Sequence, residues 1–151
     1  MSRLSDLLNI KTIYLDISAK DVEELFSIAS RDFETITHIS ATQIQQCLSD
    51  REKLGSTGLG VGVAIPHGRL KGLKVPLAGF YRISKPIDFQ APDGDPVDVA
   101  IILLVPEQAT QRHLDLLSEI AQILSDTSCR ETLREETDTK KILATLTSPT
   151  F

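Results

Sequence analysis

The sequence lacks the features that mark several large protein classes. Lys and Arg number 16 against 21 Asp and Glu, so the net charge is −5 and no basic surplus offsets nucleic-acid phosphates. The longest apolar run, residues 97–105, is interrupted by Asp98 and is far shorter than the about 20 residues that cross a bilayer. The first ten residues lack the apolar centre of a signal peptide. We therefore expect a cytoplasmic protein that binds no nucleic acid and does not insert directly into a membrane.

Cysteine and nucleotide-binding motifs are equally scarce. The two cysteines, Cys47 and Cys129, match no metal-ligand spacing and are typical of reduced core residues in an intracellular protein. Gly58, Gly60 and Gly62 do not form the GxGxxG pattern, and no GK[ST] follows them. The sequence therefore predicts neither a cofactor nor a metal.

What is present predicts one α/β domain over residues 1–151, since the chain is 151 residues long, 41% hydrophobic and 25% charged. Apolar periodicity predicts strands at 11–17, 59–65, 75–83, 87–89 and 97–105. It predicts helices at 4–8, 111–125, 126–135 and 138–146, and two more that follow Ser18 and Ser40. We expect a mixed parallel and antiparallel sheet of about five strands between helical layers.

Helix boundaries can also be predicted from capping residues. Ser18 and Thr110 are expected N-caps, and Ser40 with Gln43 forms a capping-box pattern. Gly55 should end the second long helix, which leaves Arg51 in its last turn. In the 111–125 helix, one face is expected to be core, namely Leu114, Leu117, Ile120, Ala121 and Leu124.

The segment that organises the chain is residues 51–69, which reads REKLGSTGLGVGVAIPHGR. His67 stands between Pro66, which stiffens the backbone, and Gly68, which lacks a Cβ and leaves room for another molecule. Upstream, Ser56, Thr57 and Gly58 belong to a loop of small residues that offers hydroxyl and backbone N–H donors to a phosphoryl group. The pattern predicts a histidine exposed for chemistry at the edge of a sheet.

A second histidine, His113, lies in the first turn of the 111–125 helix, where free N–H groups and the helix dipole favour an anion. We expect the strands before His67 and His113 to lie side by side and bring both imidazoles to one sheet edge. A neutral imidazole is a competent nucleophile near pH 7, and a second one can hydrogen-bond a phosphoryl oxygen. Arg51 could pair with the remaining oxygens and stabilise their charge.

The same motifs resemble the IIA proteins of the fructose/mannitol family of the phosphotransferase system. The likeness lies in Arg51, GSTG at 55–58, PHG at 66–68, APDG at 91–94 followed by PVDV, and RHLDLLSEIA at 112–121, and it spans nearly the whole chain. The resemblance implies an enzyme of the phosphotransferase type, namely a regulatory phosphohistidine carrier, which is not a classical turnover enzyme. His67 would be phosphorylated, His113 would be auxiliary, Arg51 would stabilise charge, and Ser56, Thr57, Gly58 and Gly68 would surround the phosphoryl group.

The resemblance also implies partners. The donor would be an HPr-like phosphohistidine protein of the NPr type, and the output would be phosphorylation-dependent binding to regulatory targets, as in the nitrogen-regulatory branch. The segments AIPHGRLKGL and LLVPEQATQRHLDLL are most similar to that branch. In the alternative output, a sugar-transport IIA protein passes the group to a IIB partner.

Other interpretations of the residues stay open. His113 could be a helix cap without a role, and Arg51 a solvated charge at a helix end. A hydrolase or metal site could be built on His67 and His113, although two histidines alone make a poor zinc site. Asp93, Asp95 and Asp98 could contribute to it, but nothing in the sequence places them there. The protein could also be a binding module whose histidine never reacts.

Overall fold

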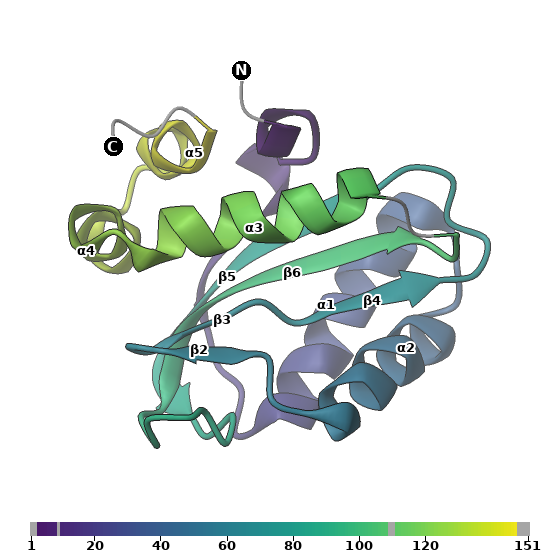
Figure 1. Cartoon of the computed structure of the whole chain (residues 1–151), viewed down its shortest axis with the longest axis horizontal. Helices are drawn as coiled ribbons and strands as arrows, with labels where there is room; N and C mark the ends of the chain where they lie inside the picture. Colours follow the sequence, from purple (N-terminus) through teal and green to yellow (C-terminus); the bar gives the residue numbers. More distant parts are fainter. Residues whose placement is uncertain (1–2, 9, 109–110, 148–151) are drawn as a thin grey trace.

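The computed structural model describes residues 3–8, 10–108 and 111–147, which form a mixed sheet between two helical layers (Figure 1). The strands described are β1 (Ile13–Ile17), β2 (Gly58–Gly60), β3 (Val63–Ala64), β4 (His67–Leu70), β5 (Leu77–Ile87) and β6 (Val97–Pro106). The helices are α1 (Val22–Thr37), α2 (Ala41–Leu54), α3 (Gln111–Ser125), α4 (Thr127–Glu135) and α5 (Thr139–Thr147), with short 3-10 turns η1 (Arg3–Asp6) and η2 (Ile10–Thr12).

The sheet is centred on β6. Its order is β1-β5-β6-β3-β2, and β4 also pairs with β6, beyond the end of β3. β5 runs antiparallel to β6, whereas β3 and β4 run parallel to it, and β1 runs parallel to β5. The predicted α/β class with a mixed sheet is confirmed, with six strands in the described residues where about five were expected.

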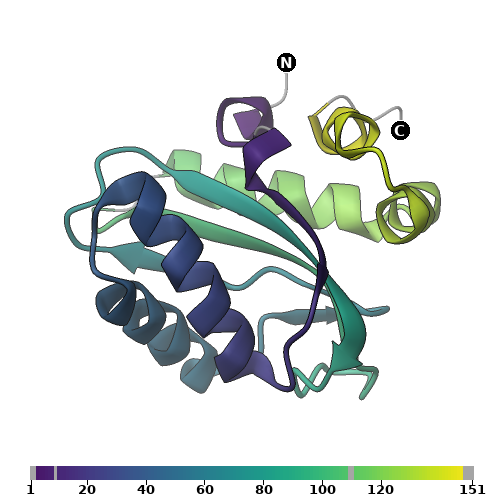
Figure 2. The same ribbon diagram turned by 180° about the vertical axis from the view of Figure 1, so that it is seen from behind.

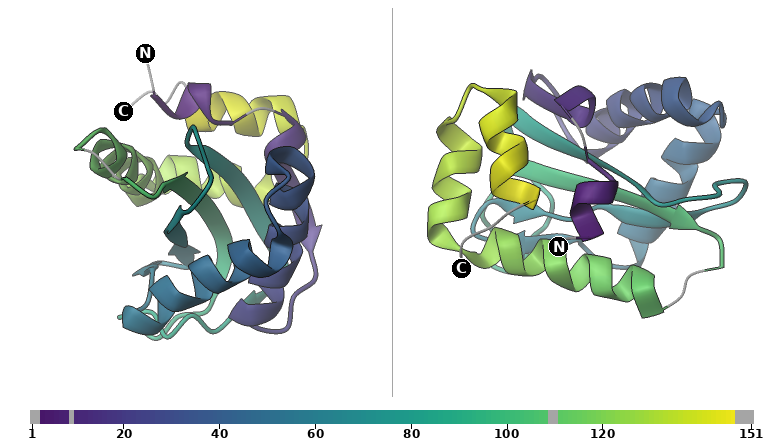
Figure 3. Two further views of the ribbon diagram at one scale, coloured as in Figure 1. Left: turned by 90° about the vertical axis from the view of Figure 1, so that its right-hand side faces the viewer. Right: turned by 90° about the horizontal axis from the view of Figure 1, so that it is seen from above.

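Both faces of the sheet are buried, as the nearly continuous apolar composition of β6 predicts. Val99, Ile101 and Leu103 face the layer of α3, α4 and α5, whereas Ile102 and Leu104 face α1 and α2. This alternation follows from the two-residue repeat of a strand. Figure 2 shows α1 and α2 on one side of the sheet, and the view from above in Figure 3 shows α3 to α5 on the other side.

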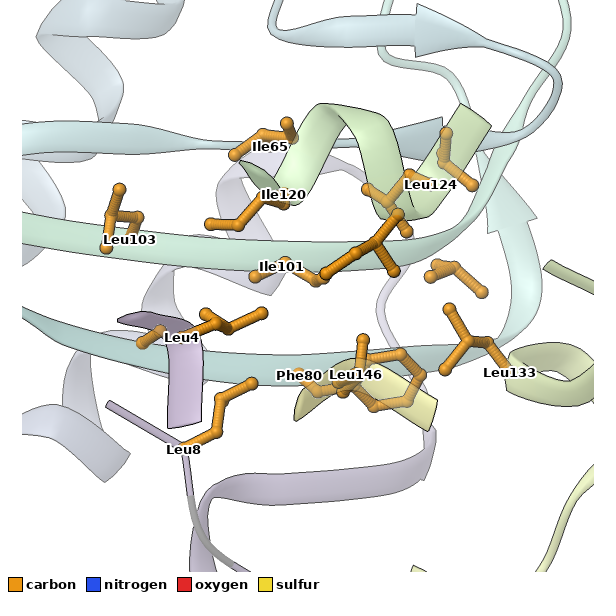
Figure 4. Packing of buried hydrophobic residues seen from close by; sticks show 14 of the residues in the cluster. Leu4, Leu8, Ile65, Phe80, Ile101, Leu103, Ile120, Leu124, Leu133 and Leu146 are labelled. Atoms are coloured by element: carbon orange, nitrogen blue, oxygen red, sulfur yellow. The ribbon is translucent and has the colours of Figure 1, made fainter. Parts of the chain in front are cut away.

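The core on the α3 side is mostly aliphatic, with Phe80 among its members, and it draws on both ends of the chain. Leu4 and Leu8 pack beside Leu146 of α5, so the N-terminal and C-terminal segments lie together on one face of the sheet (Figure 4). All three side chains are at most 5% exposed. Helix α3 contributes Leu116, Ile120, Ile123 and Leu124 to this core.

Two strand predictions were wrong near the centre of the chain. The expected strand at 59–65 is divided into β2 and β3, which pair antiparallel around a turn at Val61. Gly60 and Gly62 have φ of 90° and 81°, a conformation that glycine adopts readily, and Val61 itself has φ of 51°. The antiparallel pair of β2 and β3 therefore stands where one continuous strand was expected. A further strand, β4, begins at His67.

The predicted strand at 87–89 is also not separate, because β5 continues through Ile87. At the N-terminus, the predicted helix at 4–8 is instead the short 3-10 turn η1.

The predicted caps were only partly correct. Asp21, not Ser18, caps α1, because its Oδ1 accepts the Glu24 N–H at 2.8 Å. Ser40 precedes α2 without a side-chain cap bond, and Gln43 instead donates to the Lys71 carbonyl at 3.0 Å, so the capping box does not form. The predicted cap Thr110 lies outside the described residues. No helix in the described ranges has the length and hydrophobicity needed to cross a membrane.

Candidate active site

A cavity of about 450 Å³ lies between the C-terminal half of α2, strand β4 and the start of α3. It collects residues that are far apart in the sequence: Arg51 from α2, His67 from β4 and His113 from α3 all line it. The expected juxtaposition of the strands is present, because β4 pairs directly with β6 and α3 follows β6. The three side chains singled out in the sequence therefore share one cavity.

His67 is the first residue of β4 and is partly buried. Its Nδ1 lies 2.8 Å from the carbonyl oxygen of Ile65. A carbonyl oxygen only accepts hydrogen bonds, so Nδ1 carries the proton and Nε2 carries the lone pair. Pro66 is held in turn by its carbonyl, which accepts the Leu103 N–H at 2.9 Å. The backbone before His67 thus fixes both the ring and its tautomer.

The surroundings of His67 favour the neutral imidazole. Burial lowers the pKa of His67 below the ordinary value, because the charged ring would lose its hydration. The hydrogen bond to Ile65 acts in the opposite direction, Arg51 lowers the pKa further and Glu52 raises it. With burial dominant, the neutral form of the His67 imidazole is favoured at physiological pH.

Arg51 stands in the last turn of α2, as predicted, and Gly55 ends the helix. Its Nη1 donates to the Gly55 carbonyl at 2.9 Å, which anchors the guanidinium at the cavity wall. Among the described residues, Arg69 of β4 also lines the cavity, and Asp50 is the one acidic residue there. Two guanidinium groups against one carboxylate leave this wall with the positive balance that suits an anionic group.

His113 is the third residue of α3 and is 9% exposed. Its position in the first helical turn places the imidazole where the positive end of the helix dipole faces the cavity region. Sequence reasoning put it there because the apolar strand β6 and the following helix were recognisable, and the structure has both elements at the expected residues.

The loop of small residues occupies a different position. Ser56 donates through Oγ to the Phe89 carbonyl at 2.6 Å, and the Thr57 hydroxyl donates to Glu52 Oε1, also at 2.6 Å. Neither residue, nor Gly58, lines the cavity that contains His67. Their predicted contact with a phosphoryl group stays a prediction, whereas their observed bonds secure the segment that leads to His67.

Gly68 lines the cavity, but its lack of a Cβ serves packing against α2. A Cβ added at Gly68 would lie 2.6 Å from Cys47 Sγ and 3.3 Å from the Cys47 carbonyl oxygen. The Cys47 thiol donates to the Arg69 carbonyl at 3.1 Å, and burial raises the pKa of Cys47 to about 11. The glycine thus lets β4 approach α2 closely enough to place His67 and Arg51 on one cavity.

Sequence reasoning missed two exposed leucines at the cavity. Leu54, the last residue of α2, is 85% exposed, and Leu114 is 54% exposed, although it was assigned to the core face of its helix. The sequence of α3 did indicate an exposed apolar residue, because its apolar residues cover more of the helix surface than the face that packs on the core. Leu117 is only partly buried and also lines the cavity.

The aspartates that were considered for a metal site have other partners. Asp93 accepts the Val61 N–H at 2.8 Å, and Asp98 pairs with Arg134 at 3.0 Å. Across the described ranges, no group of three or more His, Cys, Asp or Glu side chains is arranged to hold a metal ion.

Known proteins share the sequence pattern and the fold of this chain. Residues 6–148 match the family model "Phosphoenolpyruvate-dependent sugar phosphotransferase system, EIIA 2". The crystal structure of nitrogen regulatory protein IIA-Ntr from Neisseria meningitidis is 43% identical with a TM-score of 0.93, over 97% of this chain and 100% of that one. The crystal structure of IIA mannitol from Escherichia coli is 25% identical with a TM-score of 0.78, over 92% of this chain and 98% of that one.

The chain belongs to this EIIA 2 family of the phosphotransferase system. Within the family it is more similar to nitrogen regulatory proteins than to sugar-specific components. The nitrogen regulatory protein of Pseudomonas aeruginosa is 43% identical over 75% of this chain and 71% of its own length. The fructose-specific EIIABC component of Bacillus subtilis is 28% identical over 88% of this chain and 21% of its own length.

Proposed function

We propose that this protein accepts a phosphoryl group on Nε2 of His67 from an HPr-like phosphohistidine protein and that its phosphorylation state controls binding to regulatory targets. The observation that carries the proposal is the bond from Nδ1 to the Ile65 carbonyl. It leaves Nε2 as the ring nitrogen with a lone pair, on a side chain that lines the cavity.

The chemistry is a single exchange of N–P bonds. The Nε2 lone pair attacks the donor's phosphorus in line, the donor's N–P bond breaks, and its imidazole leaves with the electron pair. His67 keeps the proton on Nδ1 and needs no separate base. The Nε2–P bond that forms retains a high transfer potential, so the group can be passed on or held as a signal.

Arg51 and His113 are assigned to the oxygens of the transferred group. Arg51 would stabilise their charge, and His113 would hydrogen-bond one of them. Attraction between unit charges about 4 Å apart is roughly 4 kcal/mol at an effective dielectric of about 20, against about 1 in water. A docked donor that excludes water from the cavity therefore strengthens these contacts when they are needed.

The regulatory output is supported by the higher identity to nitrogen regulatory proteins than to a sugar-specific component, 43% against 28%. Phosphorylation adds negative charge beside Leu54 and Leu114, which changes the character of an exposed apolar rim. The alternative output is transfer to a IIB partner. It is supported by the fold shared with the mannitol IIA protein of Escherichia coli, which has been determined in complex with phosphorylated IIB mannitol.

The test is a reconstituted relay driven by phosphoenolpyruvate, with intact-mass and peptide mass spectrometry of the product. We expect one acid-labile phosphoryl group on His67 and none in His67→Ala. Undiminished labelling of that variant would remove the proposal. Pull-downs with phosphorylated and unphosphorylated protein then separate the two outputs, because a regulatory target should bind one form preferentially and a IIB partner should remove the label.

A further inference from the structure

A continuous series of hydrogen bonds joins the last turn of α2 to the imidazole of His67. It begins at Glu52, whose carboxylate accepts twice from Thr57: Oε2 from the backbone N–H at 2.9 Å and Oε1 from the hydroxyl at 2.6 Å. The Thr57 carbonyl accepts the Ile65 N–H at 3.1 Å. The Ile65 carbonyl is the acceptor for His67 Nδ1 at 2.8 Å.

The middle of this series is buried, whereas Glu52 and His67 at its ends are partly exposed. Thr57 is 6% exposed and Ile65 is 5% exposed. Charged acceptors form the stronger hydrogen bonds, and exclusion of water strengthens them further. The two bonds to one carboxylate fix both the position and the orientation of Thr57. The Thr57 carbonyl, through its bond to the Ile65 N–H, in turn fixes Ile65. With the Pro66 carbonyl bound to Leu103, the peptide that faces His67 is held from both sides.

We propose that Glu52 is a positioning residue, which acts through Thr57 and Ile65 to hold His67 in the tautomer with Nδ1 protonated and Nε2 available as the nucleophile. Glu52 itself does not line the cavity that contains His67, and it lines a separate cavity together with Ser56. The consequence of this positioning for phosphoryl transfer rests on the proposed function, whereas the effect of Glu52 on the His67 ring does not.

The neighbouring residue on α2 strengthens the inference. Arg51 binds the Gly55 carbonyl and lines the cavity, while Glu52 binds Thr57. The last turn of α2 is thus hydrogen-bonded to the same loop at two points. The Arg51 bond places the guanidinium, and the Glu52 bonds orient the imidazole of His67, so one rigid helix end sets the relative position of the two groups.

The charge of Glu52 offers a competing explanation, since a nearby carboxylate acts on an imidazole through space as well. Glu52→Gln separates the two. Its oxygen can accept the Thr57 N–H and its amide can donate to the Thr57 hydroxyl, so the bonds persist without the charge. Glu52→Ala removes both. At Thr57, Thr57→Ser keeps the hydroxyl and Thr57→Val removes it at nearly constant volume. Glu131→Gln, on the exposed surface of α4, is the control for lost charge.

The experiment is ¹H–¹⁵N NMR of the His67 ring at a pH where it is neutral, combined with the initial rate of relay phosphorylation. We expect the Nδ1-protonated pattern in wild type, Glu52→Gln, Thr57→Ser and Glu131→Gln. In Glu52→Ala and Thr57→Val the ring should become a mixture of tautomers, and the rate should fall roughly tenfold, the low end of the effect seen for partners that orient metal-binding histidines.

Wild-type tautomer in both Glu52→Ala and Thr57→Val would overturn the inference. A tautomer change in Glu52→Gln equal to that in Glu52→Ala would also overturn it, by assigning the effect to charge. If Glu52→Ala does not fold, the isosteric Thr57→Val with its Thr57→Ser partner decides. If the variants show the expected tautomer change but the relay does not label the wild-type protein, the positioning role of Glu52 is supported and the proposed function is removed.

Discussion

His67 lies opposite Leu103 in the parallel pairing of β4 with β6. Three residues after Leu103, β6 ends at Pro106, and the chain continues to α3, whose third residue is His113. The pairing therefore brings two histidines that are 46 positions apart in the sequence to one cavity. Strand β4 also packs closely against α2 at Gly68 and Cys47, and Arg51 of α2 lines the same cavity.

The protonation of His67 provides the first prediction. Because burial lowers its pKa, the ring should remain neutral to below the ordinary value of 6.5 and become protonated only in more acidic solution. The rate of phosphoryl acceptance should be flat through neutral pH and decline on its acidic side at a pH below 6.5. NMR titration of the ring and the pH profile of the initial rate check this. A midpoint above 6.5 would contradict it.

The second prediction concerns Arg51. Arg51→Gln should slow phosphoryl acceptance by about tenfold or more, since loss of about 1.4 kcal/mol of transition-state stabilisation has that effect. The same change should raise the pKa of His67, because Arg51 opposes its protonation. Lys53→Gln, which removes a charge from the same helix end outside the cavity, is the control. Equal rates in the two variants would show that the guanidinium has no part in transfer.

Gly68 provides a prediction about stability. Gly68→Ala should lower the free energy of unfolding by about 1–3 kcal/mol, the usual cost of overpacking, because the new Cβ meets Cys47 Sγ. Cys47→Ala in the same chain should restore part of the loss. Denaturant unfolding measures both. Gly55→Ala is the matched control, since a Cβ there meets nothing within 4 Å. Equal stability of Gly68→Ala and wild type would rule out the close packing.

The exposed leucine at the end of α2 provides a prediction about partners. Leu54→Glu should change stability by less than about 0.5 kcal/mol, as is usual for a surface site, but should raise the donor concentration needed for half-maximal labelling. Ile10→Glu is the control, because Ile10 is 46% exposed in η2, which leads into the edge strand β1. If both variants respond alike, the rim beside His67 is not the docking surface.

The local sequence was enough to identify the α/β class, helices α3 to α5, the apolar strand β6 and the histidine at PHG. These are properties of neighbouring residues: apolar periodicity, helix-ending glycine and the restrictions of proline. The break of the 59–65 segment into β2 and β3 was not predictable in this way. The turn depends on Asp93 and Arg134, which hold the two polar groups of the Val61 backbone from elsewhere in the chain.

By itself, then, the sequence determined that His67 would stand in a stiff segment and that Arg51 and His113 would occupy a helix end and a helix start. Only the tertiary structure decided which ring nitrogen of His67 is protonated, why residue 68 must be glycine and what the Ser56–Thr57 loop supports. Each of these depends on a contact between residues distant in sequence or on the direction of a backbone carbonyl. Such contacts arise when strands and helices pack, and no local pattern specifies them.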